Sequence, residues 1–247
     1  MSLIEIKNAI LRKSYNIGFV EEKYINLSDD ERNKKVHWLD LNGYKKGWFA
    51  DPFFLSMDDN FIYLLVEEFV YEDNKGRLAK ITVEKKNYKL VSVDVILELD
   101  THLSFPIFFR EGDNIFVYPE NYQSGGVNLF SYNVLSNKLD FVKTIIESPL
   151  LDTQIVKIED NYYAFGVKWE TNTQEDSKTL MIYKSQSLYG PFKHIQTIKN
   201  NKKEERGAGL IYTSEGKHYR PAQSCEGGYG KAVIIYRLDL IDGRFVE

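Results

Sequence analysis

FFLSMDDNFIYLLVEE, which begins at Phe53, is the first of four similar stretches that return at intervals of roughly fifty residues. The others are IFFREGDNIFVYPEN from Ile107, QIVKIEDNYYAFGVKW from Gln154 and LIYTSEGKHYRPAQS from Leu210. Each stretch holds an apolar strand, a tight polar turn and a second apolar strand that ends in polar residues. Repeats of this length with strand patterning are typical of β-propellers and related arrays.

The turns and the segments that follow them predict the rest of each repeat. Asp, Asn and Gly tolerate the left-handed backbone of hairpin turns, and they fill the turns at 58–60, 111–114, 159–161 and 214–217. Further strand-like runs follow each hairpin, at 78–83, 127–132, 141–146, 180–184, 192–198 and 231–238. Each repeat therefore predicts a four-stranded antiparallel blade.

The segment before the repeats is also strand-like, at 17–20 and 24–25, with a short helical turn predicted at 27–35. We interpret residues 1–47 as a partial blade that closes the ring and residues 48–247 as four repeat blades. The sequence thus predicts one all-β domain over 1–247, a five-bladed β-propeller. A pair of β-sandwiches is the alternative that the length leaves open.

Composition narrows the class of partner. The net charge of −4 argues against nucleic acid as the main partner, because binding phosphates needs a basic face. A single cysteine, Cys225, allows no internal disulfide, and with only four histidines the chain shows no zinc pattern. Neither a signal-peptide pattern nor an apolar run long enough to span a membrane is visible, so we expect a cytoplasmic protein.

The register of the repeats predicts which polar residues lie together. Nine residues before the turn position stand Asp51, Phe105, Asp152 and Ala208, and the return strands end at Glu67-Glu68, Glu120, Lys168-Trp169 and Gln223-Ser224. In a propeller, the start of the first strand and the end of the second share a face. We therefore expect an acidic funnel that gathers Asp51, Asp152, Glu120, His102, Arg206 and one of the adjacent pair Glu67 and Glu68, since neighbours on a strand point to opposite sides.

Carboxyl groups that share a concavity with aromatic rings suit glycoside chemistry, which needs a proton donor and a carboxylate base or nucleophile. The predicted catalytic residues are Asp51, Asp152 and Glu120, and the predicted substrate-binding residues are Glu67, Glu68, His102, Trp169, Arg206, Arg220 and Gln223. Simpler roles stay open. Such aspartates also accept backbone hydrogen bonds in turns, His102 and Cys225 also suit structural roles, and both arginines also suit holding carboxylates in place.

Several motifs occur in an order that resembles one family: Phe49-Ala50-Asp51-Pro52-Phe53, Glu67-Glu68-Phe69, Gly76-Arg77-Leu78-Ala79, His102-Leu103-Ser104-Phe105-Pro106, Pro119-Glu120, Asp152-Thr153 and Arg220-Pro221-Ala222-Gln223-Ser224-Cys225. They resemble the propeller domain related to the N-terminal region of glucosamine inositolphosphorylceramide transferases. More distantly the chain is similar to the five-bladed propellers of glycoside hydrolase family 43 and the arabinanase, levansucrase and invertase group.

The resemblance implies roles for the acids. By likeness to family 43, Asp51 of the Asp-Pro motif is the base and Asp152 modulates the acid, whereas the acid itself is a glutamate that opens the fourth blade. Here that stretch reads Arg206-Gly207-Ala208-Gly209, and Glu205 lies outside the expected register. An inverting hydrolase without its proton donor loses about 10²–10⁴-fold in rate, although Glu120 or Glu67 remains an alternative donor.

Two functions therefore stay open: a glycosidase-like hydrolase or glycosyl-transferring enzyme, and a non-catalytic glycan-recognition domain that assists a glycosyltransferase in surface-glycan synthesis. The expected ligand is a carbohydrate or a sugar phosphate, with a glycosyltransferase as a further partner. No cofactor is assigned, and calcium in the channel is left open. A protein-interaction propeller is the weaker alternative, because the repeats carry no Trp-Asp or kelch signature.

Overall fold

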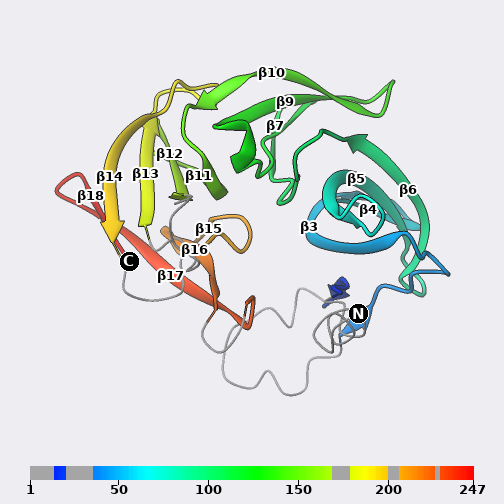
Figure 1. Cartoon of the computed structure of the whole chain (residues 1–247). Helices are drawn as coiled ribbons and strands as arrows, with labels where there is room; N and C mark the ends of the chain where they lie inside the picture. Colours follow the sequence, from blue (N-terminus) through cyan, green and yellow to red (C-terminus); the bar gives the residue numbers. More distant parts are fainter. Residues whose placement is uncertain (1–13, 21–35, 169–178, 200–205, 226–228) are drawn as a thin grey trace, which may run out of the picture.

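The computed structural model describes residues 14–20, 36–168, 179–199, 206–225 and 229–247, and it shows an all-β propeller (Figure 1). The strands form four four-stranded sheets and one two-stranded sheet. Within each four-stranded sheet, antiparallel strands follow one another in chain order. The predicted propeller of four-stranded antiparallel blades is therefore confirmed, with a different number of blades.

The four blades arise from successive parts of the chain. The first comprises β3 (Gly47–Met57), β4 (Phe61–Val70), β5 (Lys75–Glu84) and β6 (Lys89–Leu97). The second comprises β7 (Phe108–Glu111), β8 (Asn114–Val117), β9 (Val127–Asn133) and β10 (Lys138–Ile146), with the short 3₁₀ helix η3 (Tyr122–Ser124) between β8 and β9. The third comprises β11 (Leu150–Ile158), β12 (Asn161–Lys168), β13 (Thr179–Ser185) and β14 (Lys193–Lys199). The fourth comprises β15 (Tyr212–Ser214), β16 (Lys217–Ser224), β17 (Ala232–Ile241) and β18 (Arg244–Val246).

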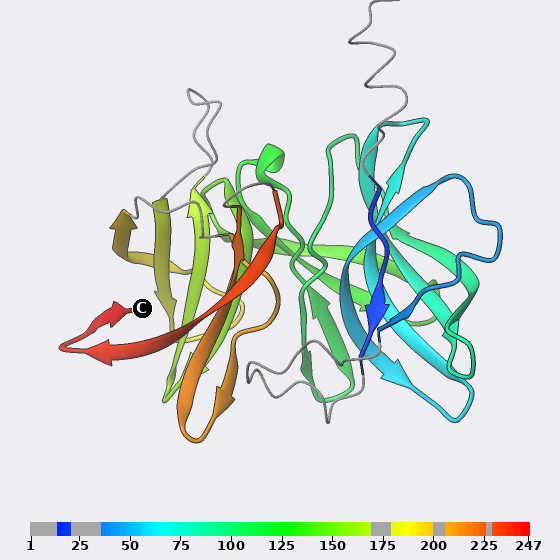
Figure 2. The same cartoon turned by 90° about the horizontal axis from the view of Figure 1, so that it is seen from below.

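The first strand of each blade lies towards the centre of the molecule, and the last lies at the periphery (Figures 1 and 2). Each predicted turn joins the first two strands of a blade, as the sequence indicates. At the β3–β4 turn, Asp58 Oδ1 accepts hydrogen bonds from the backbone amides of Asn60 and Phe61, both at 2.8 Å. Side-chain acceptors of this kind fix a turn locally, which explains why Asp recurs there.

The number of blades corrects the prediction of five. The segment before β3 forms only a two-stranded ribbon, β1 (Gly18–Phe19) paired with β2 (His37–Trp38), while the predicted helical turn and the strand at 24–25 lie outside the described residues. Asp40 bonds to the edge strand β6, since its backbone oxygen accepts from the Leu90 amide at 2.8 Å. Ile17 and Leu39 are buried against the first blade. Strands of two residues pair with each other and cover an existing blade, but they are too short to form another.

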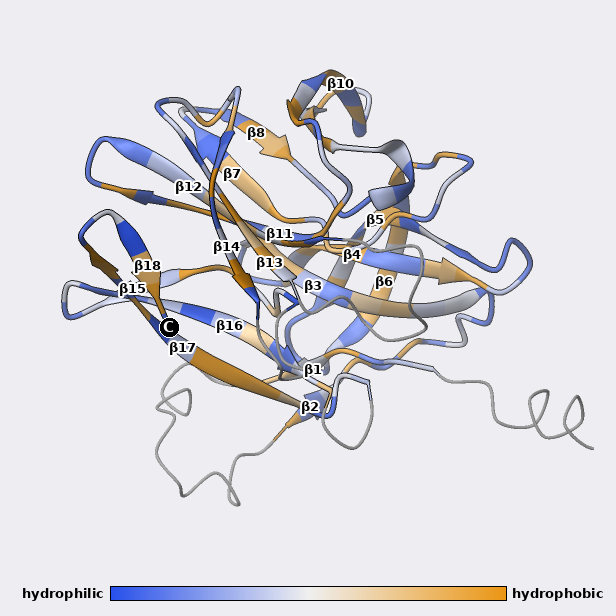
Figure 3. Ribbon diagram, turned by 60° about the vertical axis from the view of Figure 1, so that its left-hand side comes forward, coloured by the Kyte–Doolittle hydropathy of each residue, from blue (hydrophilic) through white to orange (hydrophobic). Residues whose placement is uncertain are grey.

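Three buried apolar clusters form the core. The largest fills the space between the first three blades, a second joins the ribbon to the first blade, and a third joins the third and fourth blades through Phe245. Phe245 packs edge-on against Tyr163 and Phe165 at ring distances of 4.9 and 5.0 Å. Hydrophobic stretches lie on the strands and hydrophilic ones gather at the turns (Figure 3). In the described part of the chain, no helix is long and apolar enough to cross a membrane.

Candidate functional site

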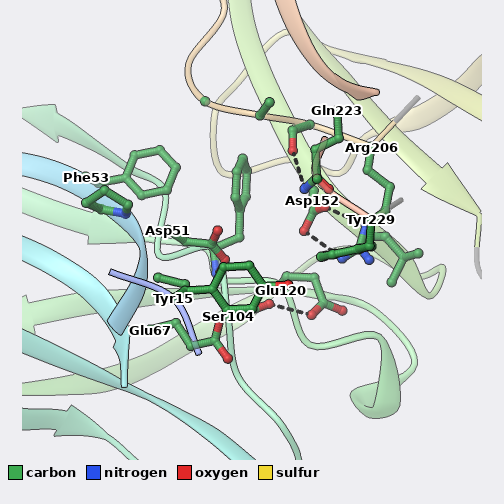
Figure 4. A pocket seen from close by; sticks show the side chains of 18 of the residues that line it. Tyr15, Asp51, Phe53, Glu67, Ser104, Glu120, Asp152, Arg206, Gln223 and Tyr229 are labelled. Atoms are coloured by element: carbon green, nitrogen blue, oxygen red, sulfur yellow. Dashed lines mark hydrogen bonds and ion pairs between the residues drawn. The ribbon is translucent and has the colours of Figure 1, made fainter. Parts of the chain in front are cut away.

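A pocket of about 620 Å³ opens among the inner strands of the blades (Figure 4). Its ionisable lining includes Asp51, Glu67, His102, Glu120, Asp152, Arg206 and Tyr229. Aromatic rings complete the wall, among them Tyr15, Trp48 and Phe69. Seven of the predicted site residues, the six ionisable ones and Gln223, thus meet in one cavity.

A repeated backbone feature presents the two aspartates. In the first blade the pairing changes from Ala50–Glu67 to Phe53–Leu65, and in the third blade from Leu151–Val167 to Gln154–Phe165, so each inner strand carries one extra residue. Such a β-bulge re-aims the side chain that it contains. Asp51 and Asp152 sit in these bulges with φ of 47° and 44°, and Phe105 has the same φ of 47° in the second blade. The count of nine residues back from each turn therefore finds a shared position in three blades.

The two glutamates also occupy matching positions. Glu67 pairs with Ala50, and Glu120 pairs with Ser104, so each lies opposite the residue that precedes a bulge. In the third and fourth blades that position holds Val167 and Ala222. The pocket's four carboxyl groups thus come from two kinds of position, each used in two of the four blades.

Each aspartate is held by the blade that follows it. Asp51 Oδ2 accepts a hydrogen bond from the Phe105 amide at 3.1 Å, and Asp152 Oδ2 accepts from Arg206 Nε at 2.7 Å. Both partners stand 54 residues further along the chain. A second bond of 3.3 Å from Arg206 Nη2 to Asp152 Oδ1 makes this ion pair bidentate.

Burial and crowding make three of the carboxyl groups hold their protons more tightly. Burial, and then the charge of Asp152, raises the pKa of Asp51 to about 6 and that of Glu120 to about 7. Burial, followed by the charges of Asp51 and Glu120, raises the pKa of Glu67 to about 9. Glu120 also accepts hydrogen bonds from Ser104 Oγ and the Tyr122 amide, each at 2.9 Å. These bonds stabilise its ionised form, so Glu120 ionises more readily than Glu67.

His102 is fixed in one tautomer. Its Nδ1 accepts a hydrogen bond from the Gly76 amide at 2.9 Å, so the proton of the neutral ring is on Nε2, which lies 3.4 Å from Glu67 Oε1. Burial and the nearby Arg206 lower the pKa of His102. Because Glu67 holds its proton near neutral pH and His102 lacks its second one, this contact joins two neutral groups.

Glycine makes the approach of these two side chains possible. A Cβ added at Gly76 would lie 2.4 Å from the backbone oxygen of Leu103 and 2.6 Å from Glu67 Oε1. Any side chain at this position would push both Glu67 and the segment between β6 and β7 away from β5. The lack of space for a Cβ therefore explains why glycine stands at position 76 of the predicted motif.

The remaining predicted residues lie elsewhere. Glu68 points away from the pocket and pairs with Arg77 through bonds of 2.9 and 3.1 Å, so the prediction that only one of the two adjacent glutamates faces the funnel agrees with the structure. Arg220 is fully buried, pairs with Glu247 and lies outside the pocket lining. Trp169 and Glu205 lie outside the described residues.

The sequence analysis did not predict the aromatic residues that line the pocket. Trp48 stacks on Phe69 with ring centroids 4.7 Å apart and meets Tyr15 edge-on at 5.0 Å, while the Arg206 guanidinium lies 5.6 Å from the centre of the Tyr229 ring. Trp48 stands three residues before Asp51 and was recoverable from the register. Tyr15 lies outside the repeats and carried no such signal.

The carboxyl groups are too dispersed for a metal ion. Across the described ranges, no three His, Cys, Asp or Glu side chains converge closely enough to hold one. Calcium needs six to eight oxygen ligands at short distance. The donor set therefore does not fit calcium, and we assign no role to it.

Similar proteins place this site in context. The chain is 25% identical over 201 residues to glucosamine inositolphosphorylceramide transferase 1 of Oryza sativa subsp. japonica, covering 80% of this chain and 27% of that protein. It is 29% identical over 206 residues to the Arabidopsis thaliana protein of the same name, covering 81% and 26%. The chain thus spans about a quarter of the length of these relatives.

Solved structures share the fold. The α-L-arabinanase of Cellvibrio cellulosa complexed with arabinohexaose aligns with a TM-score of 0.58 at 16% identity, covering 80% of this chain and 76% of that one. A GH43 β-xylosidase/α-arabinofuranosidase from a compost microbial metagenome, in complex with xylotriose, aligns with a TM-score of 0.62 at 13% identity, covering 86% and 78%. At these identities the likeness establishes the propeller fold alone. Residues 38–246 match the sequence family described as glucosamine inositolphosphorylceramide transferase 1, N-terminal, and the chain therefore belongs to that family.

Proposed function

We propose that this chain binds a glycan and that a sugar unit occupies the pocket. The observation that carries the proposal is the gathering of four carboxyl groups and several aromatic rings around one cavity of about 620 Å³. Carboxyl oxygens accept hydrogen bonds from sugar hydroxyls, and aromatic faces pack against the C–H faces of sugar rings. The volume falls within the range of about 300–1,000 Å³ typical of small-ligand pockets.

The charge of the pocket favours the sugar portion of a glycan over a phosphate. Arg206, the one described lining residue with a permanent positive charge, is already engaged by Asp152. A phosphate would face Asp51 and Glu120 without a cation to receive it, and like charges at short distance repel. A sugar phosphate would therefore bind with its phosphate outside the pocket.

The comparisons support a role in glycan metabolism. The matched relatives are named glucosamine inositolphosphorylceramide transferases, and two proteins of similar structure were determined with arabinohexaose or xylotriose. Because the relatives are about four times as long as the matched region, we propose that this propeller presents a glycan to a glycosyltransferase rather than transferring the sugar itself.

Hydrolysis is the second candidate, and one observation favours it. Asp51 and Glu120 have pKa values of about 6 and about 7, which suits a base and an acid that work near neutral pH. Against it, the stretch 206–209 supplies no carboxyl group from the fourth blade, and Arg206 neutralises Asp152. Recognition needs only the carboxyl groups and rings that are present, so it is the better-supported function.

A paired binding and turnover experiment separates the two. Wild-type protein, Asp51→Asn and the control Asp113→Asn, which removes a charge at the exposed β7–β8 turn, are applied to a glycan array and incubated with a panel of polysaccharides. Binding that Asp51→Asn weakens and Asp113→Asn preserves, without released sugars, supports recognition. Sugar release that disappears in Asp51→Asn establishes hydrolysis instead. Absence of both binding and release contradicts the proposed function.

A further inference from the structure

A second cavity, of about 440 Å³, lies beside the central pocket. Its walls are formed by residues 14–16, the β2–β3 loop, the first residues of β3 and the residue after β4. Four of its lining side chains are aromatic: Tyr15, Tyr44, Trp48 and Tyr71. Its volume lies within the range of about 300–1,000 Å³ that is typical of small-ligand pockets. The chain thus has a second place of ligand size, which the proposed function does not use.

Hydrogen bonds fix both sides of the second cavity. On one side, Nδ2 of Asn16 donates to the backbone oxygen of Leu39 at 3.1 Å, which ties residues 14–16 to the chain that follows β2. On the other side, the backbone amide of Tyr71 donates to the backbone oxygen of Lys46 at 2.9 Å. Walls that are already held lose little conformational freedom when a ligand binds. The second cavity is therefore preorganised for binding.

Two aromatic rings belong to both cavities. Tyr15 and Trp48 line the central pocket as well as the second cavity, and their ring centroids lie 5.0 Å apart. Tyr15 is 39% exposed, and Figure 4 shows it among the side chains of the central pocket. A molecule that leaves the central pocket across these two rings enters the second cavity. One chain-like ligand can therefore occupy both.

The two cavities differ in charge. The central pocket holds the carboxyl groups of Asp51, Glu67, Glu120 and Asp152, whereas the described lining of the second cavity contains no carboxyl group. The charged side chain of that lining is Lys45, which is exposed and forms no ion pair with the residues that the structure describes. An ammonium group donates up to three hydrogen bonds, which hydroxyl oxygens accept, and aromatic rings pack against the C–H faces of sugars. The second cavity therefore suits another sugar unit, held by different contacts from the first.

We infer, resting on the proposed function, that the glycan bound here extends over at least two sugar units, one in the central pocket and a further one in the second cavity. The chain of sugars crosses the rings of Tyr15 and Trp48, which both cavities share. Lys45 donates hydrogen bonds to hydroxyl oxygens of the further unit, and the ring of Tyr71 packs beside it. The ligand class is thus an oligosaccharide, or the end of a polysaccharide, rather than a single sugar.

The test measures how affinity depends on chain length. The wild-type protein is titrated calorimetrically with arabinose-, xylose- and glucose-based series, each from the monosaccharide to the hexasaccharide. In a series that binds, we expect affinity to rise at least about tenfold from the shortest binding member to the longer ones, because the second cavity adds ring contacts and a hydrogen bond. Lys45→Ala and Tyr71→Ala should each weaken the longer members about fivefold and leave the shortest unchanged. Lys46→Ala is the matched control, since Lys46 is the next residue, is exposed and lines neither cavity.

The outcomes separate the inference from the function on which it rests. Equal affinity for short and long members overturns the second sugar site and leaves glycan binding intact. So does a result in which Lys45→Ala and Tyr71→Ala bind every length as the wild type does, or weaken short and long members alike. Failure of every series to bind contradicts the proposed function itself. A Tyr71→Ala protein that unfolds leaves Lys45→Ala, a substitution at an exposed position, as the deciding variant.

Discussion

The guanidinium of Arg206 binds the carboxylate of Asp152 through two hydrogen bonds of 2.7 and 3.3 Å. The pair joins the third blade to the entry of the fourth, and its side chains are 19% and 3% exposed. A charge-assisted bidentate pair in such a setting fixes geometry as well as charge. Arg206 thus holds the Asp152 side chain in the pocket and occupies both of its carboxylate oxygens, which leaves them less able to bind a ligand.

Arg206→Gln should destabilise the protein markedly. Without the guanidinium, Asp152 stays nearly buried with its charge uncompensated, which costs on the order of 3 kcal/mol. Urea denaturation gives the change in the free energy of unfolding. The matched control is Arg237→Gln, which breaks the pair with Asp239, whose side chains are 54% and 37% exposed. An exposed pair contributes less than about 1 kcal/mol, so equal effects of the two substitutions would contradict the structural role of Arg206.

Gly76→Ala should damage both folding and the site. The added Cβ meets the backbone oxygen of Leu103 at 2.4 Å, and that oxygen cannot move without the segment between β6 and β7, whose Leu103 amide bonds to the Gly76 oxygen. Gly112→Ala serves as the control, because its Cβ meets nothing within 4 Å and only its φ of +57° is unfavourable, at a cost of about 1 kcal/mol. Thermal unfolding should therefore place Gly76→Ala well below Gly112→Ala, and a reversed order would show that the contact with Leu103 and Glu67 relaxes freely.

The pocket should make stability fall as pH rises. Glu67 has a folded-state pKa of about 9, whereas an unfolded glutamate loses its proton near pH 4.3. Between these values the folded state binds more protons than the unfolded state, so the free energy of unfolding decreases with increasing pH, by up to about 1.4 kcal/mol per pH unit for one group. Glu120 adds to the slope up to about pH 7, and Asp51 adds to it up to about pH 6.

Urea denaturation at a series of pH values measures this slope. Glu67→Gln should flatten it most above pH 7, because Glu67 is the carboxyl group of the described residues whose raised pKa lies above that pH. Asp113→Asn, at an exposed turn, should leave it unchanged. An identical slope in Glu67→Gln would mean that Glu67 ionises normally in the folded protein.

Trp48→Ala should weaken glycan binding by about tenfold, because the indole offers the broad apolar face on which a sugar ring packs. Trp48 lines the pocket and is held in place by stacking on Phe69. Trp38 in β2 is 62% exposed and lies outside the pocket lining, so Trp38→Ala is the matched control in a binding titration. Binding that survives Trp48→Ala unchanged would place the sugar elsewhere in the cavity.

At position 51 glycine should be more stable than alanine, which reverses their usual order. Asp51 has a φ of 47°, a left-handed conformation that costs a residue with a Cβ about 1 kcal/mol. Asp51→Gly and Asp51→Ala both remove the carboxyl group, so their difference in the free energy of unfolding isolates the backbone term. The same two substitutions at Asp113, which has no positive φ, should show alanine equal to or better than glycine.

The sequence was sufficient to predict what depends on local repetition. The alternation of strands and Asp-rich or Gly-rich turns predicts the blades, and counting from Asn60 and Asn161 finds Asp51 and Asp152 in matching bulges. A bulge repeats because its cause is local: one extra residue in the inner strand.

The structure of the segment before the repeats could not be predicted from the repeat pattern. The strand-like residues 17–20 suggested a fifth blade, but whether a short strand starts a new sheet or covers an old one depends on Ile17 and Leu39 packing against the first blade. Arg220 looked equivalent to Arg206 in the sequence. The structure shows that Arg220 pairs with Glu247 and does not line the pocket.

Each bulge contains one residue with a left-handed backbone, and this residue points its side chain without taking part in strand pairing. Asp51, Phe105 and Asp152 share one backbone conformation although the Phe105 side chain has nothing in common with the two aspartates. The hydrogen bonds that pair the strands are made by their neighbours, so the chemical identity of these three residues is left open by the sheet. Exchanging Asp51 alters the charge that a ligand meets, whereas Phe105 belongs to the buried core and Asp152 is bound by Arg206. Of the three bulge positions, position 51 is therefore the one at which a single substitution changes the charge of the pocket without removing a core side chain or a buried ion pair.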